Sequence, residues 1–165
     1  MREIKFEFVF QHPEKKDVVI SDDYTIGDML DTSIDQIQEN CCVCDCHPIG
    51  ESNFTECNCD EYYMAFELIG KRQYTGLKDK NGKDIYEGDL LRNPAQDEWS
   101  EKNFSAFEVF FHDGDANSDY NIGYSISRMH NHGSICGGYI PAFKPKYTSN
   151  MVVIGNIYET PELLS

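Results

Sequence analysis

Residues 73–91 have the sequence QYTGLKDKNGKDIYEGDLL, and this turn-rich stretch decides the fold of the chain. The Asn81-Gly82 pair predicts a tight β-hairpin, because both residues tolerate the positive φ that such a turn needs. Glu87-Gly88-Asp89 predicts a second turn, and Leu90-Leu91-Arg92 predicts the start of a strand. No residue of the stretch is an evident nucleophile or base. The stretch therefore predicts a turn, a hairpin and entry into a sheet rather than a reaction.

Short strands and turns are expected over most of the remaining chain. Ile4, Phe6, Phe8 and Phe10 recur with a period of two, which predicts a half-buried strand. The polar segment 12–17 predicts a turn with an exposed His12, followed by a second strand at residues 18–20, antiparallel to the first. Further strands are expected at residues 61–69, 104–111, 122–126, 139–143 and 151–158.

The last strands carry three more local signals. Residues 104–111 are dense in aromatic side chains, which predicts a strand buried on both sides. Gly155 predicts a bulge, and Pro161 is suited to the first position of a closing helical turn at residues 161–164. In all we expect about seven or eight short strands, and so a mainly β fold of the small-barrel or sandwich kind.

Residues 25–40 follow a helical pattern instead. Thr25 with Asp28, and Ser33 with Gln36, each predict a helix N-terminus. The pattern therefore predicts one or two short helices near residues 25–40. We expect their apolar stripe to pack on the sheet rather than to bind a partner. The residues of the stripe are Ile26, Met29, Leu30, Ile34 and Ile37.

Three segments resemble the YopX family, whose members are small proteins encoded by phages and prophages. They are residues 1–6 (MREIKF), residues 73–89 around KDKNGKD and IYEGD, and residues 153–164 (VIGNIYETPELL). Residues 8–69 and the loops after Leu91 lie outside the resemblance. The resemblance implies a mainly β fold and a phage or prophage origin. It implies no catalytic residues.

Length and composition predict a single domain over residues 1–165, with a cysteine-rich insertion at about residues 41–60. A chain of 165 residues with 40% hydrophobic residues can bury a sizeable core. No run approaches the roughly 20 apolar residues of a membrane span, and Glu3, Lys5 and Glu7 interrupt any secretion signal. We therefore expect a protein of the host cytoplasm, with no membrane partner and with reduced cysteines.

The charge is strongly acidic and uneven. The net charge is −15, with 16 acidic and 4 basic residues in residues 1–69, against 13 and 10 in residues 70–165. Direct binding to DNA is not expected, because phosphate contacts need clustered Lys and Arg. The acidic half is suited to a partner with a basic surface or to mimicry of nucleic acid. The plainer interpretation is a solvated face that keeps the protein soluble.

Six of the seven cysteines lie within residues 41–60, which makes this segment a candidate metal site. Zinc is commonly held by two closely spaced cysteine pairs. The predicted ligands are Cys44, Cys46, Cys57 and Cys59. Cys41, Cys42 and His47 leave other ligand sets open, and free thiols or disulfides are the alternatives. One zinc ion here would be structural, since four cysteines leave no open position for water.

Other constellations are weaker. Asp113, Asp115, Asn117 and Asp119 begin like a calcium loop, but the glycine and the closing glutamate of such a loop are missing. An acidic turn is the alternative interpretation. His130, His132 and Cys136 offer a small metal site or a Cys–His nucleophile pair, or else a glycine-rich loop.

The sequence therefore predicts a non-enzymatic accessory protein of a phage or prophage that binds a host or phage protein. Two alternatives use the same residues: an acidic decoy for a nucleic-acid-binding host protein, and a zinc-stapled interaction protein. A cysteine or metal hydrolase built on Cys136 is a further one. Exposed strand edges also allow a homo-oligomer.

Overall fold

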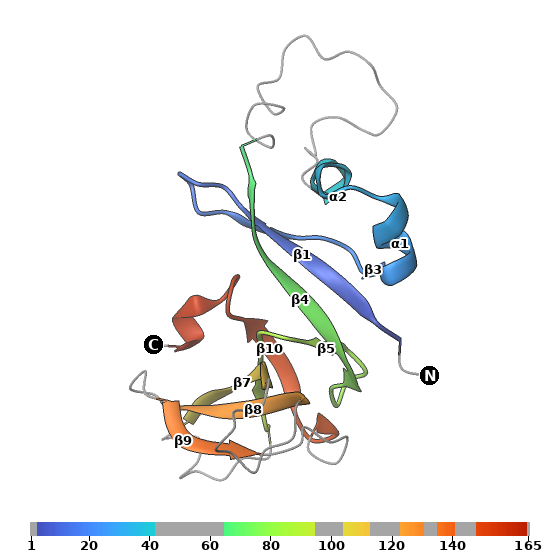
Figure 1. The fold of residues 1–165 in the computed structure, drawn as a ribbon. Helices are drawn as coiled ribbons and strands as arrows, with labels where there is room; N and C mark the ends of the chain where they lie inside the picture. The colour runs from blue at the N-terminus through green and yellow to red at the C-terminus, as the bar shows by residue number, and fades with distance from the viewer. Residues whose placement is uncertain are drawn as a thin grey trace. The chain divides into compact units, whose positions relative to one another are not determined.

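A computed structural model of the chain describes residues 3–41, 65–94, 104–112, 123–130, 135–140 and 148–164. The described residues form two antiparallel sheets with two short helices (Figure 1), so the prediction of a mainly β fold is confirmed. The strands are β1 (Lys5–Gln11), β2 (Val18–Ile20), β3 (Tyr24–Thr25), β4 (Glu67–Lys78), β5 (Asp84–Tyr86), β6 (Asp89–Arg92), β7 (Phe104–His112), β8 (Gly123–His130), β9 (Ile135–Ile140) and β10 (Val152–Asn156). The helices are α1 (Ile26–Asp31) and α2 (Ile34–Cys41), with a 3₁₀ turn, η1, at Pro161–Leu164.

Residue contacts divide the chain into two compact units, an N-terminal unit (Glu3–Arg72) and a C-terminal unit that includes Gln73–Ser165. Strand β4 begins in the first unit and ends in the second. The prediction of a single domain stays a prediction. The strands of the described residues exceed the predicted seven or eight, because two- and three-residue strands such as β3 and β5 give almost no periodicity signal.

In the N-terminal unit, β1 lies between β2 and β4 and also pairs with β3. Val9 is opposite Ile20 and Phe10 is opposite Val19, so β2 is antiparallel to β1 as predicted. Val9 is fully buried, so this strand is not half-buried along its whole length. The hydrophobic core of the unit consists of Phe8, Phe10, Ile37 and Phe66, with Phe6, Val19, Tyr24 and Met29 packed against it.

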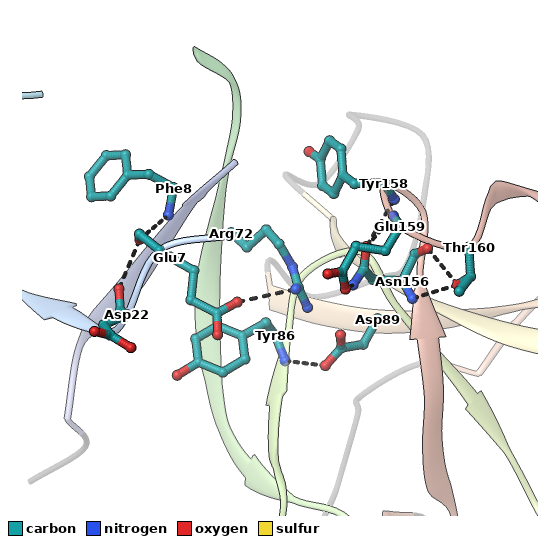
Figure 2. Close-up of polar contacts among 11 residues, drawn as sticks. Glu7, Phe8, Asp22, Arg72, Tyr86, Asp89, Asn156, Tyr158, Glu159 and Thr160 are labelled. Atoms are coloured by element: carbon teal, nitrogen blue, oxygen red, sulfur yellow. Dashed lines mark hydrogen bonds and ion pairs between the residues drawn. The ribbon is translucent and has the colours of Figure 1, made fainter. Parts of the chain in front are cut away.

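The turn predicted at residues 12–17 is present, but two polar side chains of this unit are buried. His12 is buried, with 6% of its surface exposed, so the prediction of an exposed loop histidine is wrong. Its Nδ1 accepts hydrogen bonds from the backbone N–H groups of Glu14 and Lys15, both at 3.2 Å, and closes the turn that was predicted there. Arg72 is also buried and pairs with Glu7, with 3.1 Å between Nη1 and Oε2 (Figure 2).

Reciprocal side-chain caps start both helices, as predicted. Thr25 Oγ1 accepts the Asp28 N–H at 3.3 Å, and Asp28 Oδ2 accepts the Thr25 N–H at 2.7 Å. In the same way Ser33 Oγ accepts the Gln36 N–H at 3.2 Å, and Gln36 Oε1 accepts the Ser33 N–H at 2.8 Å. Because the second cap restarts the chain at Ser33, there are two helices rather than one.

In the C-terminal unit the strand order of the second sheet is β10-β6-β7-β8-β9, and β5 pairs with the last residues of β4. The core of the unit contains Ile85, Leu91, Val109, Ile126 and Met151, with Leu77, Phe107, Tyr124 and Val153 packed against it. The register shifts between Val153 and Gly155, which confirms the predicted bulge, and η1 confirms the closing helical turn.

Three strands of this unit differ from the predictions. Strand β8 was expected at residues 122–126 but continues to His130. Strand β7 is not buried on both sides at its end, since 44% of Phe111 is exposed. Strand β9 was expected at residues 139–143 but begins at Ile135. Pairing with β8 carries its backbone through Gly137 and Gly138, which local propensity alone treats as strand breakers. Within the described ranges, no helix is long and apolar enough to cross a membrane.

Candidate functional site

The hairpin at Asn81-Gly82 joins β4 to β5, as predicted, but its turn is longer than a two-residue turn. The Gly82 N–H donates to the Asp79 carbonyl at 3.1 Å, and the Asp79 N–H donates to the Lys83 carbonyl at 2.8 Å. Only Gly82 of the pair has a positive φ, at 86°. This is a three-residue loop, a turn followed by a left-handed glycine. The predicted hairpin is therefore confirmed, and Gly82 is the residue of the pair that supplies the positive φ.

Asp79 holds this hairpin closed and ties it to β10. Its side chain is buried; Oδ1 accepts the backbone N–H groups of Asn81 at 2.7 Å and Lys83 at 2.9 Å, and Oδ2 accepts the Val153 N–H at 3.1 Å. Burial raises the pKa of Asp79. The three N–H donors and the Lys83 charge together lower it by a larger amount, so the pKa lies below its ordinary value. The carboxylate is thus a structural acceptor and not a base.

The second predicted turn, at Glu87-Gly88-Asp89, is also confirmed, and buried backbone bonds fix it. Gly88 has φ of 81°; its N–H donates to the Val109 carbonyl at 2.7 Å, and its carbonyl accepts the Ile157 N–H at 2.9 Å. Asp89, 3% exposed, accepts the Tyr86 N–H at 2.8 Å through Oδ2 (Figure 2). The turn therefore links β5, β7 and the end of β10.

A third turn follows β10 and depends on Asn156. Its Oδ1 accepts the N–H groups of Tyr158 at 3.0 Å and Glu159 at 2.9 Å, and its Nδ2 donates to the Glu159 carboxylate at 2.6 Å (Figure 2). Thr160 Oγ1 accepts the Asn156 N–H and donates to the Asn156 carbonyl. Gly155 is required beside it, because a Cβ atom there would lie 2.1 Å from Thr160 Oγ1.

We call these residues the turn cluster: Asp79, Gly88, Asp89, Gly155, Asn156 and Thr160. They lie in two of the three segments that resemble the YopX family, and each bonds the backbone of a turn or, for Gly155, closely approaches the Thr160 side chain. The polar atoms described above are engaged in holding turns, so these segments explain the fold of the C-terminal unit and not a reaction.

The predicted metal ligands Cys44, Cys46, Cys57 and Cys59 lie outside the described residues, and the zinc site stays a prediction. The calcium-like residues Asp113, Asp115, Asn117 and Asp119 also lie outside them, as does His132. His130 is the last residue of β8. Cys136 in β9 is opposite Arg128 of β8. Among the residues that the structure does describe, no group of three or more His, Cys, Asp or Glu side chains could hold a metal ion.

The surface of α1 and α2 is the feature that sequence reasoning missed. Only Ile37 and Met29 of the predicted stripe belong to the core. Ile26 is 51% exposed, Leu30 83% and Ile34 38%, so the expectation that the whole stripe packs on the sheet is wrong. Met29 and Leu30 are about 100° apart around α1, and the Ser33 cap restarts the helix before Ile34. The reciprocal cap was the signal that one continuous stripe could not form.

Acidic residues alternate with these apolar ones. Asp28, Asp31 and Asp35 are all exposed, and neither helix carries a basic residue in its last turn. Two intramolecular contacts fix α2 in place: the core position of Ile37, and a hydrogen bond of 2.7 Å from Gln38 Nε2 to the Phe66 carbonyl. We call the set Ile26, Leu30, Ile34, Asp28, Asp31 and Asp35 the helical face.

Comparison with known proteins identifies the family. A family model described as YopX protein matches residues 14–165, so the chain belongs to the YopX family. Among solved structures, protein EF1440 from Enterococcus faecalis is similar, with 21% sequence identity over 97% of this chain and 98% of that chain and a TM-score of 0.43. The search of curated proteins gave no match.

Proposed function

We propose that this YopX-family protein is a non-enzymatic accessory protein of a phage or prophage that acts in the host cytoplasm by binding another protein. The observation that carries the proposal is the exposure of Ile26, Leu30 and Ile34 on two short, capped helices. Single exposed apolar residues are ordinary, whereas contiguous ones are typical of interaction sites, and Ile26 and Leu30 are one turn apart on α1. Fully burying one such side chain contributes roughly 1.5–3 kcal/mol.

Two further observations support binding over catalysis. The carboxylates of Asp79 and Asp89 accept backbone N–H groups and are thereby held as structural groups. The pKa of Asp79 is also lowered, the opposite of what a general acid at neutral pH requires. The zinc-stapled alternative for residues 41–60 stays a prediction, and one zinc per chain by elemental mass spectrometry would support it.

Capture of a partner from host lysate tests the proposal. Immobilised protein is expected to retain one or a few proteins in a stoichiometric amount, and Leu30→Ser is expected to retain less. Leu68→Ser is the matched control, because Leu68 is an exposed leucine (44%) in the same unit but on β4. Retention of no protein above the level of an unrelated acidic protein would contradict the proposal.

An acidic decoy for a nucleic-acid-binding protein is the second candidate, and the net charge of −15 favours it. A decoy would bind through charge alone, so its affinity would fall steeply with salt. It would also be indifferent to Leu30→Ser. Binding that survives physiological salt and needs Leu30 would therefore select the first candidate over the decoy.

A further inference from the structure

We propose that the helical face binds a protein segment that carries apolar side chains flanked by lysine and arginine. This inference rests on the proposed function and names the partner's chemistry. The occupant follows from what the face presents, which is three exposed apolar side chains among exposed carboxylates.

The apolar residues of the helical face lie on helices that are ordered before a partner binds. Ile26 and Leu30 are four residues apart on α1 and so lie on one side of that helix. Ile34 begins α2 directly after the Ser33 cap. Both helices begin with reciprocal caps, and α2 is fixed by Ile37 in the core. A surface that is already ordered loses little conformational entropy when a partner binds.

The exposed carboxylates of the helical face favour a positively charged partner. Exposed carboxylates occur at Asp22, Asp23, Asp28, Asp31 and Asp35. The sequence from Asp17 to Gly70 contains 13 acidic residues and not one Lys or Arg. Lys5, which pairs with Asp23 at 2.6 Å, is therefore a local counter-charge that comes from outside that segment.

This charge pattern disfavours other occupants. Nucleic acids and anionic membranes would be repelled by the carboxylates. An acidic protein segment would bring like charges together as the surfaces lose water. A cationic amphipathic segment gains from both features, because its apolar side chains cover Leu30 and its neighbours while its lysines meet the aspartates at the rim.

Two synthetic peptides test the inference with the full-length protein. One is a short helical peptide of leucine and lysine, and the other has the same pattern with glutamate in place of lysine. Fluorescence anisotropy is expected to show binding of the lysine peptide and not of the glutamate peptide. Leu30→Ser should weaken binding by about tenfold or more. The double variant Asp31→Asn/Asp35→Asn should weaken it and reduce its dependence on salt.

Matched variants separate the helical face from general acidity. Leu68→Ser removes an exposed leucine of β4, and Glu14→Gln/Asp17→Asn removes two exposed acids of the turn between β1 and β2 in the same unit. We expect both to bind like wild type. If they weaken the lysine peptide as much as the helical variants do, or if Leu30→Ser binds like wild type, the inference is overturned.

The lysate experiment distinguishes this inference from the proposed function. A captured partner that Leu30→Ser still retains would leave protein binding intact and overturn the helical face. Peptide binding that depends on Leu30, without any partner in the lysate, would support the chemistry of the face and count against the proposed function. Thermal melting of each variant shows whether it folds; Leu30 is 83% exposed, so Leu30→Ser is expected to melt like wild type.

Discussion

The Asp79 side chain joins the hairpin of β4 and β5 to β10, beside a backbone hydrogen bond from the Lys80 N–H to the Met151 carbonyl. Replacing Asp79 by alanine leaves the N–H groups of Asn81, Lys83 and Val153 without their acceptor. We expect Asp79→Ala to lower the free energy of unfolding by about 2–3 kcal/mol, measured by urea denaturation. Lys80→Ala is the control, because it truncates an exposed side chain of the same hairpin and should cost less than about 0.5 kcal/mol. Equal losses for the two variants would refute the role of Asp79.

Two carboxylates of the C-terminal unit should respond to pH in opposite directions. The folded-state pKa of Asp79 is lowered, so its contribution is present above the unfolded pKa of about 4 and is lost as the pH falls through the folded value. Burial raises the pKa of Glu108 in β7, so its ionisation destabilises the fold as the pH rises from about 4 through that raised value. Glu108→Gln should therefore stabilise the protein at neutral pH and lose this advantage in acid. Urea denaturation over a pH series checks the signs, and a Glu108→Gln difference that does not change with pH would contradict them.

Substitution of Gly155 tests the close approach of β10 to Thr160. A Cβ atom at Gly155 would lie 2.1 Å from Thr160 Oγ1, so Gly155→Ala should cost about 2 kcal/mol or more. Adding Thr160→Ala should recover part of that loss, giving a non-additive double-mutant cycle. Gly27→Ala is the matched control: its nearest contact is 3.5 Å away in α1, and we expect no loss of stability there. Additive costs for Gly155 and Thr160 would argue against the contact.

At the scale of elements, α1 and α2 divide their apolar residues between the core and the surface. Ile37 is 1% exposed and belongs to the core with Phe8 and Phe10, so Ile37→Ala should cost about 2–5 kcal/mol. Leu30→Ala, at 83% exposure, should change the free energy of unfolding by less than about 0.5 kcal/mol. Chemical denaturation of both variants measures the difference. Similar costs would mean that Leu30 packs inward, as the sequence pattern had suggested.

The elements that sequence reasoning predicts correctly are those that short-range bonds define. The caps at Thr25 and Ser33 and the hairpin at Gly82 each join residues at most four positions apart. Sequence reasoning fails where contacts between segments distant in the sequence determine the structure. Pairing with β8 sets where β9 begins, and Asp79 reaches Val153, 74 residues away. Local periodicity carries no information about such contacts, and it could not show which part of the helical stripe would remain exposed.

At the scale of the whole molecule, each unit has its own hydrophobic core, and the acidic charge is concentrated in the N-terminal half. The family-like segments account for the turns of the C-terminal unit, whereas the candidate binding residues lie in the N-terminal unit. This division of roles predicts that variants of the turn cluster act on stability, and that variants of the helical face act on binding.

Hydrogen exchange of the full-length protein, with and without the leucine–lysine peptide, tests this division most directly. We predict added protection in α1 and α2 (residues 26–41), with no change at residues 79–91 or 151–160. Protection confined to the turn cluster, with the helices unchanged, would contradict the account and move the binding site to the C-terminal unit.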